Sequence, residues 1–273
     1  MTVTELPRPR ERRQRVQAAE TSMAVLKALG HLGGRAGLSL IAARIGESPA
    51  KVHRYLVSLM EGGLVGQDAA TQQYFLGLET LLLGLAAMRQ ADPIRLAEAS
   101  LVRLREELEV TCFVAVMGNK GPTIVRFEEP GLPVTVNVRV GSVLPMLWSA
   151  TGQVLLATLD EHAVRALAQA DLDAATPEQR AMLDAADPIG TLRRAVLAAG
   201  CAVVRDTNLR GISAVSAPIY SYTGRPCAVL TALGATGGFD ASPDGRVGLA
   251  VRREAQAISR LLGDTPPQEN VRS

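Results

Sequence analysis

The sequence predicts an α+β protein of two domains, an N-terminal winged helix-turn-helix and a larger domain built on a mostly antiparallel sheet. Three observations support this fold. Helical periodicity between residues 21 and 59 is divided by glycines into three short segments. Two short apolar segments with a polar tip between them follow at residues 64–77, as in a β-hairpin. Beyond residue 110, apolar runs of strand length are separated by Gly, Pro and Asn.

Composition excludes several classes of protein. The 273 residues exceed the usual size of one domain, and the longest apolar stretch, residues 76–88, is broken by Glu79 and is too short to cross a bilayer. No apolar signal segment follows the Arg-rich N-terminus, so we expect a cytoplasmic protein without membrane contact. The widely spaced cysteines and histidines predict no metal site, disulfide or cofactor: Cys112, Cys201, Cys227, His31, His53 and His162.

The charge is unevenly divided along the chain. Residues 1–75 hold ten basic and six acidic side chains, so they carry +4 and the remainder carries −2 of the net +2. Residues 1–18 are rich in Arg and Pro and lack periodicity, which predicts a disordered basic arm. Arg13 and Arg15 in this arm either contact nucleic-acid phosphates or are solvated, and composition favours neither.

Residues 21–46 predict the first two helices. The run TSMAVLKALG ends at Gly30, and Gly33 and Gly34 form the break. Ser39 is expected to cap a second helix, which Gly46 ends in a position suited to positive φ.

The segment SPAKVHRYLVSL, residues 48–59, predicts the third helix. Ser48 is its cap and Pro49 its first residue, where the missing N–H has no cost. An apolar stripe must face inward: Val52, Tyr55, Leu56 and Leu59. The opposite face is small and basic, with these residues at its centre and margins: Ala50, Lys51, His53, Arg54, Val57 and Ser58.

A helix with this face, preceded by a tight turn and followed by a wing, fits the major groove of double-stranded DNA. Arg54 and Lys51 would donate to guanine acceptors or phosphates, while Ser48 and His53 suit backbone contacts. A solvated basic helix is the alternative. The predicted DNA-binding residues are Arg13, Arg15, Ser39, Ser48, Ala50, Lys51, His53, Arg54 and Ser58.

A leucine-rich helix at residues 78–88 follows the wing, and Asp92 and Pro93 start another that runs to about Leu108. So apolar a helix is more typical of an interface between domains or subunits than of an exposed spacer. The predicted domains are a basic arm (1–18), a winged helix-turn-helix (19–77), a linker helix (78–91), a sensor-like α+β domain (92–265) and a flexible tail (266–273).

The second half predicts strands at 111–118, 123–129, 134–141, 214–221 and 227–234, and helices at 151–159, 161–169, 195–199 and 244–262. The short connections KGP and YTGRP are typical of hairpins, which makes the sheet mostly antiparallel. We expect the helices on one face of it.

Several segments resemble the IclR family of bacterial transcriptional regulators. They are LSLIAARIGESPAKVHRYLVSLMEGGLVGQD, YFLGLETLLLG, VRVGSVLPMLWSATGQVLLATL and GISAVSAPIYSYTGRPCAVLTALG, and the similarity spans roughly residues 20–263. The resemblance implies a winged helix-turn-helix, a linker helix and a GAF-like effector-binding domain. It also implies homodimers or tetramers whose affinity for operator DNA is changed by a small organic effector. Pro49, Ala50 and Lys51 depart from the commonest family pattern.

The resemblance further implies an effector cavity lined by residues 141–151, the loop near Arg205, and strands around Ala214, Ser216 and Thr231. By their chemistry, apolar side chains before the helix at 151 would supply walls, and amides at its start would favour a carboxylate, with Arg205 as a clamp. The predicted effector-binding residues are Gly141, Leu144, Met146, Trp148, Ser149, Ala150, Thr151, Arg205, Ala214, Ser216 and Thr231.

An enzyme or a metabolite-binding module without a role in DNA regulation is the competing hypothesis. Catalysis needs a nucleophile, a base and stabilising donors in one cleft, and neither the surroundings of His53 nor the rest of the sequence offers such a set. We therefore expect no enzyme. The expected partners are double-stranded operator DNA, a small organic acid, and further copies of the chain as a homodimer or a dimer of dimers.

Overall fold

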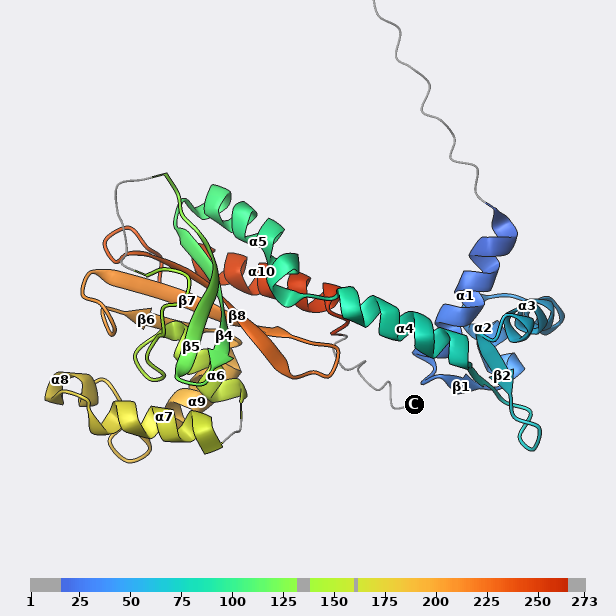
Figure 1. Cartoon of the computed structure of the whole chain (residues 1–273), viewed down its shortest axis with the longest axis horizontal. Helices are drawn as coiled ribbons and strands as arrows, with labels where there is room; N and C mark the ends of the chain where they lie inside the picture. Colours follow the sequence, from blue (N-terminus) through green and yellow to red (C-terminus); the bar gives the residue numbers. More distant parts are fainter. Residues whose placement is uncertain (1–15, 132–137, 160–161, 265–273) are drawn as a thin grey trace, which may run out of the picture. The chain divides into compact units, whose positions relative to one another are not determined.

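The computed structural model of the chain describes residues 16–131, 138–159 and 162–264 (Figure 1). Its contacts divide the chain into two compact units, unit 1 (Met1–Gln90) and unit 2 (Ala91–Ser273). The predicted fold class is confirmed: a helix-turn-helix unit precedes an α+β unit with an antiparallel sheet. The expectation for residues 1–15, including Arg13 and Arg15, lies outside the described residues.

Unit 1 is a three-helix core with a small antiparallel sheet of order β1-β3-β2. Its described elements are α1 (Gln17–His31), β1 (Arg35–Ala36), α2 (Leu38–Ile45), α3 (Pro49–Glu61), β2 (Val65–Gln67), β3 (Tyr74–Leu76) and α4 (Leu78–Gln90). The predicted hairpin is confirmed as β2 and β3. β1 was not predicted, because two residues are too short for a periodic signal.

Close packing in the wing requires glycine at position 66. A Cβ at Gly66 would lie 2.4 Å from the Phe75 ring on the neighbouring strand. Gly46 ends α2 with φ +70, as predicted, in the left-handed region that glycine adopts readily. The prediction that Ser39 caps α2 is wrong: the cap position is Gly37, and Ser39 lies exposed within the first turn.

Unit 2 is built on a sheet of order β5-β4-β8-β7-β6, in which every neighbouring pair is antiparallel. Its described strands are β4 (Thr111–Gly118), β5 (Gly121–Glu128), β6 (Ala202–Arg205), β7 (Ile212–Tyr220) and β8 (Pro226–Ala235). Its described helices are α5 (Pro93–Leu108), α6 (Ala150–Thr158), α7 (His162–Asp173), α8 (Pro177–Arg180), α9 (Pro188–Ala199) and α10 (Arg246–Leu261).

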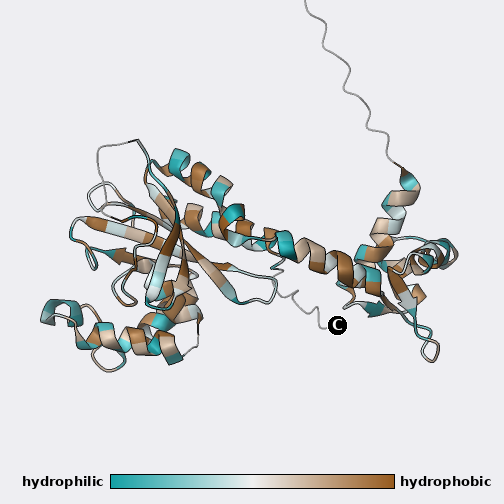
Figure 2. Ribbon diagram, viewed as in Figure 1, coloured by the Kyte–Doolittle hydropathy of each residue, from teal (hydrophilic) through white to brown (hydrophobic). Residues whose placement is uncertain are grey.

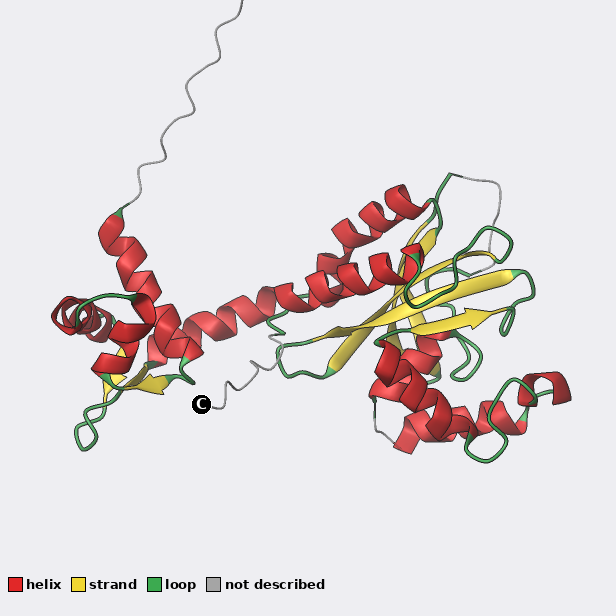
Figure 3. Cartoon of the chain, turned by 180° about the vertical axis from the view of Figure 1, so that it is seen from behind, coloured by secondary structure: helices red, strands yellow, loops and turns green. Residues whose placement is uncertain are grey.

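The expectation of helices on one face of the sheet is wrong. Cys112 and Val114 pack in a core beneath α5 and α10, whereas Phe113 and Ala115 face the opposite side. There α6, α7 and α9 form a second apolar layer (Figures 1 and 3). Strands covered on both sides are apolar along their whole length, which explains runs such as TCFVAVMG.

One strand predicted in unit 2 is not found in its described part, and one observed strand was not predicted. Of the strand expected at 134–141, residues 134–137 lie outside the described residues, and residues 138–141 form no strand. Gly141 instead sits in a turn at φ +89, where its amide donates to the carbonyl of Ile124 over 2.8 Å. β6 was not predicted, because its four residues AVVR are too few to show alternation.

Candidate functional site

The N-terminus of α3 is held in place by local hydrogen bonds. The Ser48 hydroxyl accepts from the amide of Lys51 over 3.3 Å, with Pro49 at the first helical position, as predicted. Val52, Leu56 and Leu59 are buried in the core of unit 1. This packing leaves the opposite side of the helix to solvent.

The outward face of α3 carries the predicted side chains unequally. Ala50, His53, Arg54 and Ser58 are exposed, and Arg54 makes no ion pair with any residue in the described part of the chain. Lys51 is only half-exposed, and its Nζ lies 2.6 Å from Oε1 of Glu47. The guanidinium of Arg54 is therefore the positive group on this face that is free to meet an anion.

His53 connects the helix to the wing. Its Nδ1 lies 3.1 Å from the hydroxyl of Tyr74 on β3, whose ring is buried in the core of unit 1. One ring nitrogen is thus occupied, while the residue as a whole is exposed. This contact fixes the wing relative to α3.

The wing holds a charged pair, next to its tip, that was not predicted from the sequence. Arg35 Nη1 lies 3.1 Å from Asp68 Oδ2, and its guanidinium stacks 5.2 Å from the centroid of Phe75. Asp68 Oδ1 accepts from the amides of Ala70 and Thr71. The Thr71 amide and the Arg35 side chain lower the pKa of Asp68 to about 2. A carboxylate that caps the hairpin tip stays ionised at neutral pH.

The helix α4 presents an apolar seam. Much of its ribbon is hydrophobic (Figure 2). Leu78, Leu81, Leu85 and Met88 recur at spacings of three and four, and all four are exposed. Such spacing is typical of the contact line between two associating helices. In the described part of unit 1, no residue of α4 is buried.

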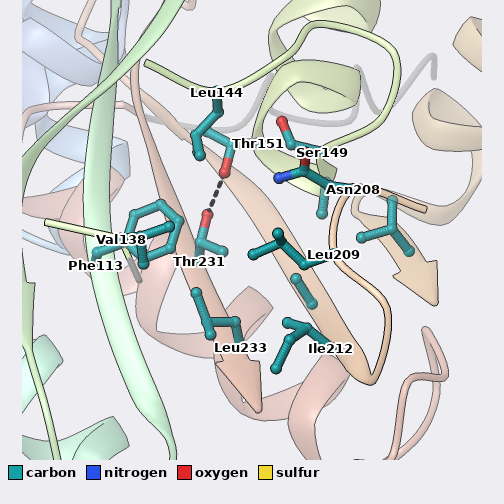
Figure 4. Close-up of a pocket in the computed structure, with 13 residues that line it drawn as sticks. Phe113, Val138, Leu144, Ser149, Thr151, Asn208, Leu209, Ile212, Thr231 and Leu233 are labelled. Atoms are coloured by element: carbon teal, nitrogen blue, oxygen red, sulfur yellow. Dashed lines mark hydrogen bonds between the residues drawn. The ribbon is translucent and has the colours of Figure 1, made fainter. Parts of the chain in front are cut away.

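A pocket lies in unit 2 between α6, the sheet and the loop that joins β6 to β7 (Figure 4). About 430 Å³ of its space is not filled by protein atoms, part of it open to solvent. Its walls are mainly apolar, and no charged side chain is among the described residues that line it: Phe113, Val138, Leu144, Ser149, Ala150, Thr151, Val204, Asn208, Leu209, Ile212, Ala214, Thr231 and Leu233.

Six predicted effector-binding residues line this pocket: Leu144, Ser149, Ala150, Thr151, Ala214 and Thr231. Five do not. Met146 and Trp148 pack into the core beneath α6. Arg205 donates to the carbonyl of Ala241 rather than into the pocket. Gly141 lies in its turn, and Ser216 is buried behind Thr231.

The first turn of α6 is rigidly built. The Ser149 hydroxyl donates to the carbonyl of Pro145 over 2.6 Å and accepts from the amide of Gly152 over 2.9 Å. A Cβ at Gly152 would lie 2.4 Å from the carbonyl oxygens of Pro145 and Met146, so only glycine allows this close approach. The amides of Ala150 and Thr151 have no acceptor among the residues that the structure describes.

Seven pocket residues were not predicted: Phe113, Val138, Val204, Asn208, Leu209, Ile212 and Leu233. The loop that carries Asn208 and Leu209 is held by Asp206, whose Oδ1 accepts from Gly211 and Thr236, and by Thr207, which donates to the carbonyl of Trp148. The loop near Arg205 was predicted to line the cavity, but the sequence does not show which of its side chains face the pocket.

In the described parts of the chain, no three His, Cys, Asp or Glu side chains are grouped to hold a metal ion. Burial raises the pKa of the Cys112 thiol to about 12, which leaves it protonated and unreactive. No helix within the described ranges is long and apolar enough to cross a membrane.

Comparison with known proteins gives two matching family models, the IclR helix-turn-helix domain over residues 18–69 and the bacterial transcriptional regulator IclR C-terminal domain over residues 85–260. The glycerol operon regulatory protein of Streptomyces coelicolor is 29% identical, covering 91% of this chain and 97% of that protein. The transcriptional repressor AllR of Salmonella typhi is 26% identical, covering 92% of each. The crystal structure of Pseudomonas aeruginosa HmgR matches with a TM-score of 0.82 and 38% identity, covering 91% of this chain and 98% of that one.

Proposed function

The chain belongs to the IclR family of bacterial transcriptional regulators, and we propose that it reads operator DNA with the exposed face of α3. The observation that carries this proposal is the exposed, unpaired guanidinium of Arg54 on a capped helix followed by a wing. Arg54 would donate to guanine acceptors in the major groove. Ala50 is small enough to let the helix approach the bases, and Ser58 and the free side of His53 suit phosphates.

Lys51 has a different proposed role. Its pairing with Glu47 cancels its charge locally, so it reaches a phosphate only when that ion pair opens. Ser48 acts through the helix cap, and Ser39, exposed on α2, suits a backbone contact. Arg13 and Arg15 of the arm add phosphate contacts in this proposal.

We propose a homodimer held by the seam of α4, with dimers of dimers as a further state. An isologous interface pairs the same apolar residues from both copies and presents two copies of α3. The operator would then be nearly palindromic, with half-sites about one helical turn or a multiple apart.

The unit 2 pocket is the proposed effector site. An effector changes operator affinity only if it prefers one conformation of the protein, and a coupling of about 1–3 kcal/mol changes affinity about five- to 150-fold. The amides that open α6 favour a carboxylate, and the walls favour an apolar body. Arg205 is not part of this site, because its guanidinium is bonded elsewhere. As a regulator of bacterial DNA, the chain would act in the cytoplasm and without catalysis.

A titration of labelled promoter DNA from a neighbouring gene tests DNA reading. Arg54→Ala should weaken the specific complex by about 1–3 kcal/mol, with a larger loss on operator than on unrelated DNA. Arg225→Ala is a matched control, because it removes the same charge from an exposed turn of unit 2. Equal losses in both variants would contradict base reading by α3. A wild-type chain that shows no sequence preference would favour a metabolite-binding module instead.

A further inference from the structure

Three buried hydroxyls form a hydrogen-bonded chain that ends at the pocket of unit 2. Figure 4 shows the bond between Thr151 and Thr231. Thr231 Oγ1 lies 2.9 Å from Thr151 Oγ1 and 2.7 Å from Ser216 Oγ. Each of these side chains is at most 1% exposed. Thr151 and Thr231 line the pocket, whereas Ser216 lies behind them.

The three hydroxyls have more protons than there are hydrogen bonds between them. Each hydroxyl has one proton to donate, and two hydrogen bonds use two of the three. The third proton has no acceptor among the three hydroxyls. Among the residues that the structure describes, none offers a further acceptor to any of the three hydroxyls.

Burial decides where the spare proton lies. On Ser216 it would be unpaired in the core, where an unsatisfied donor has a large desolvation cost. If Ser216 donates to Thr231, and Thr231 to Thr151, the spare proton faces the pocket instead. At that end it joins the amides of Ala150 and Thr151 in the first turn of α6.

We infer that the effector presents a hydrogen-bond acceptor, a carboxylate or carbonyl oxygen, to the Thr151 hydroxyl, and that Ser216 is a positioning residue that orients this donor. The inference rests on the proposed effector role of the pocket. The apolar walls take the rest of the molecule, so it is a small acid or carbonyl compound with an apolar body. A cationic ligand finds no counter-charge among the described lining residues.

Two probes of the same shape test this chemistry. Benzoate carries only acceptors at its polar end, and benzamidine carries only donors. Benzoate or 4-methylpentanoate, at 100 times its dissociation constant, should raise the Tm of the full chain by about 5 °C or more, and benzamidine should not. Thr151→Val should weaken acid binding about tenfold, and Thr151→Ser should retain it. No stabilisation by either acid at 10 mM, or equal stabilisation by benzamidine, overturns the inference.

A measurement without ligand tests the direction of the hydroxyl chain. Thr231→Val leaves two protons unpaired, one of them in the core, and should lower Tm by about 2–4 °C. Thr151→Val and Ser216→Ala still leave one spare proton at the pocket, so each should change Tm by less than about 1 °C. An equal loss in Thr151→Val and Thr231→Val would refute the proposed direction. Operator binding by the ligand-free variants is read separately, so a failure of the regulator proposal remains distinguishable.

Discussion

Replacing Leu81 and Leu85 by Gln should convert the proposed dimer to monomers. These side chains are 58% and 39% exposed in the single chain, so about half of each remains to be buried by a partner. Full burial of a leucine stabilises by about 1.5–3 kcal/mol, so the remaining half contributes about 1 kcal/mol. Each substitution occurs twice in an isologous interface, so the two substitutions together should reduce the free energy of dimerisation by about 4 kcal/mol. Because every 1.4 kcal/mol is tenfold, the dimer Kd should rise about a thousandfold.

Sedimentation of the full chain over a range of concentrations measures this Kd. The control is Leu40→Gln, which removes a leucine of similar exposure from α2 and should leave the dimer intact. The same double variant should lose most of its affinity for a two-half-site operator while it keeps weak binding to one half-site. Dimers of unchanged Kd would refute the assignment of the α4 seam, and equal loss in the Leu40 variant would point to a non-specific effect.

Three further predictions concern charged residues. Arg54→Gln should reduce operator affinity by about 1–3 kcal/mol and relax preference at one base pair, measured against a set of mutated operators; a uniform loss at all sequences would assign Arg54 to a phosphate instead. Glu47→Gln should free Lys51 from its ion pair and raise the affinity for unrelated DNA. The plot of log affinity against log salt concentration should become steeper by about one unit. An unchanged slope would mean that Lys51 does not contact DNA. Burial raises the pKa of Glu254, but hydrogen bonds from Arg103 and Ser100 outweigh this effect and hold the pKa below its ordinary value. The ionised carboxylate therefore stabilises unit 2 above about pH 4.5. This stabilisation is lost as pH falls through the lowered pKa. Glu254→Gln should therefore destabilise by about 1–2 kcal/mol at pH 7 in urea unfolding, and the difference from wild type should shrink as pH falls through the lowered pKa. A difference that does not change with pH would show that the charge of Glu254 has no role.

Local signals predicted the third helix and the end of the second helix in unit 1. Ser48, Pro49 and Gly46 each act within a few residues of their own position, so capping and turn chemistry could be recognised in the sequence. The pairing of Lys51 with Glu47 was not predicted, although the two lie four positions apart, because Glu47 precedes the cap Ser48 and lies outside the helix. Ser39 was misassigned because Gly37 already supplies the extended residue before α2.

The pocket depends on contacts that no local pattern contains. Thr151 and Thr231 are 80 positions apart and meet only because α6 packs on the face of β8. Leu144 and Trp148 were both predicted as pocket walls from their apolar character. That character does not show which way a side chain points: Leu144 faces the pocket, whereas Trp148 packs in the core. Arg205 had suitable chemistry for a clamp, yet its side chain turns to the Ala241 carbonyl on a distant loop.

Sequence-specific DNA binding by α3 is tested by fluorescence anisotropy of the wild-type chain and of Arg54→Ala on the chain's own promoter. We expect a complex that survives excess unrelated DNA and that the substitution weakens about five- to 150-fold. Its affinity should shift when a bound acid stabilises unit 2. Equal affinity for promoter and unrelated DNA, with no effect of Arg54→Ala, would contradict it.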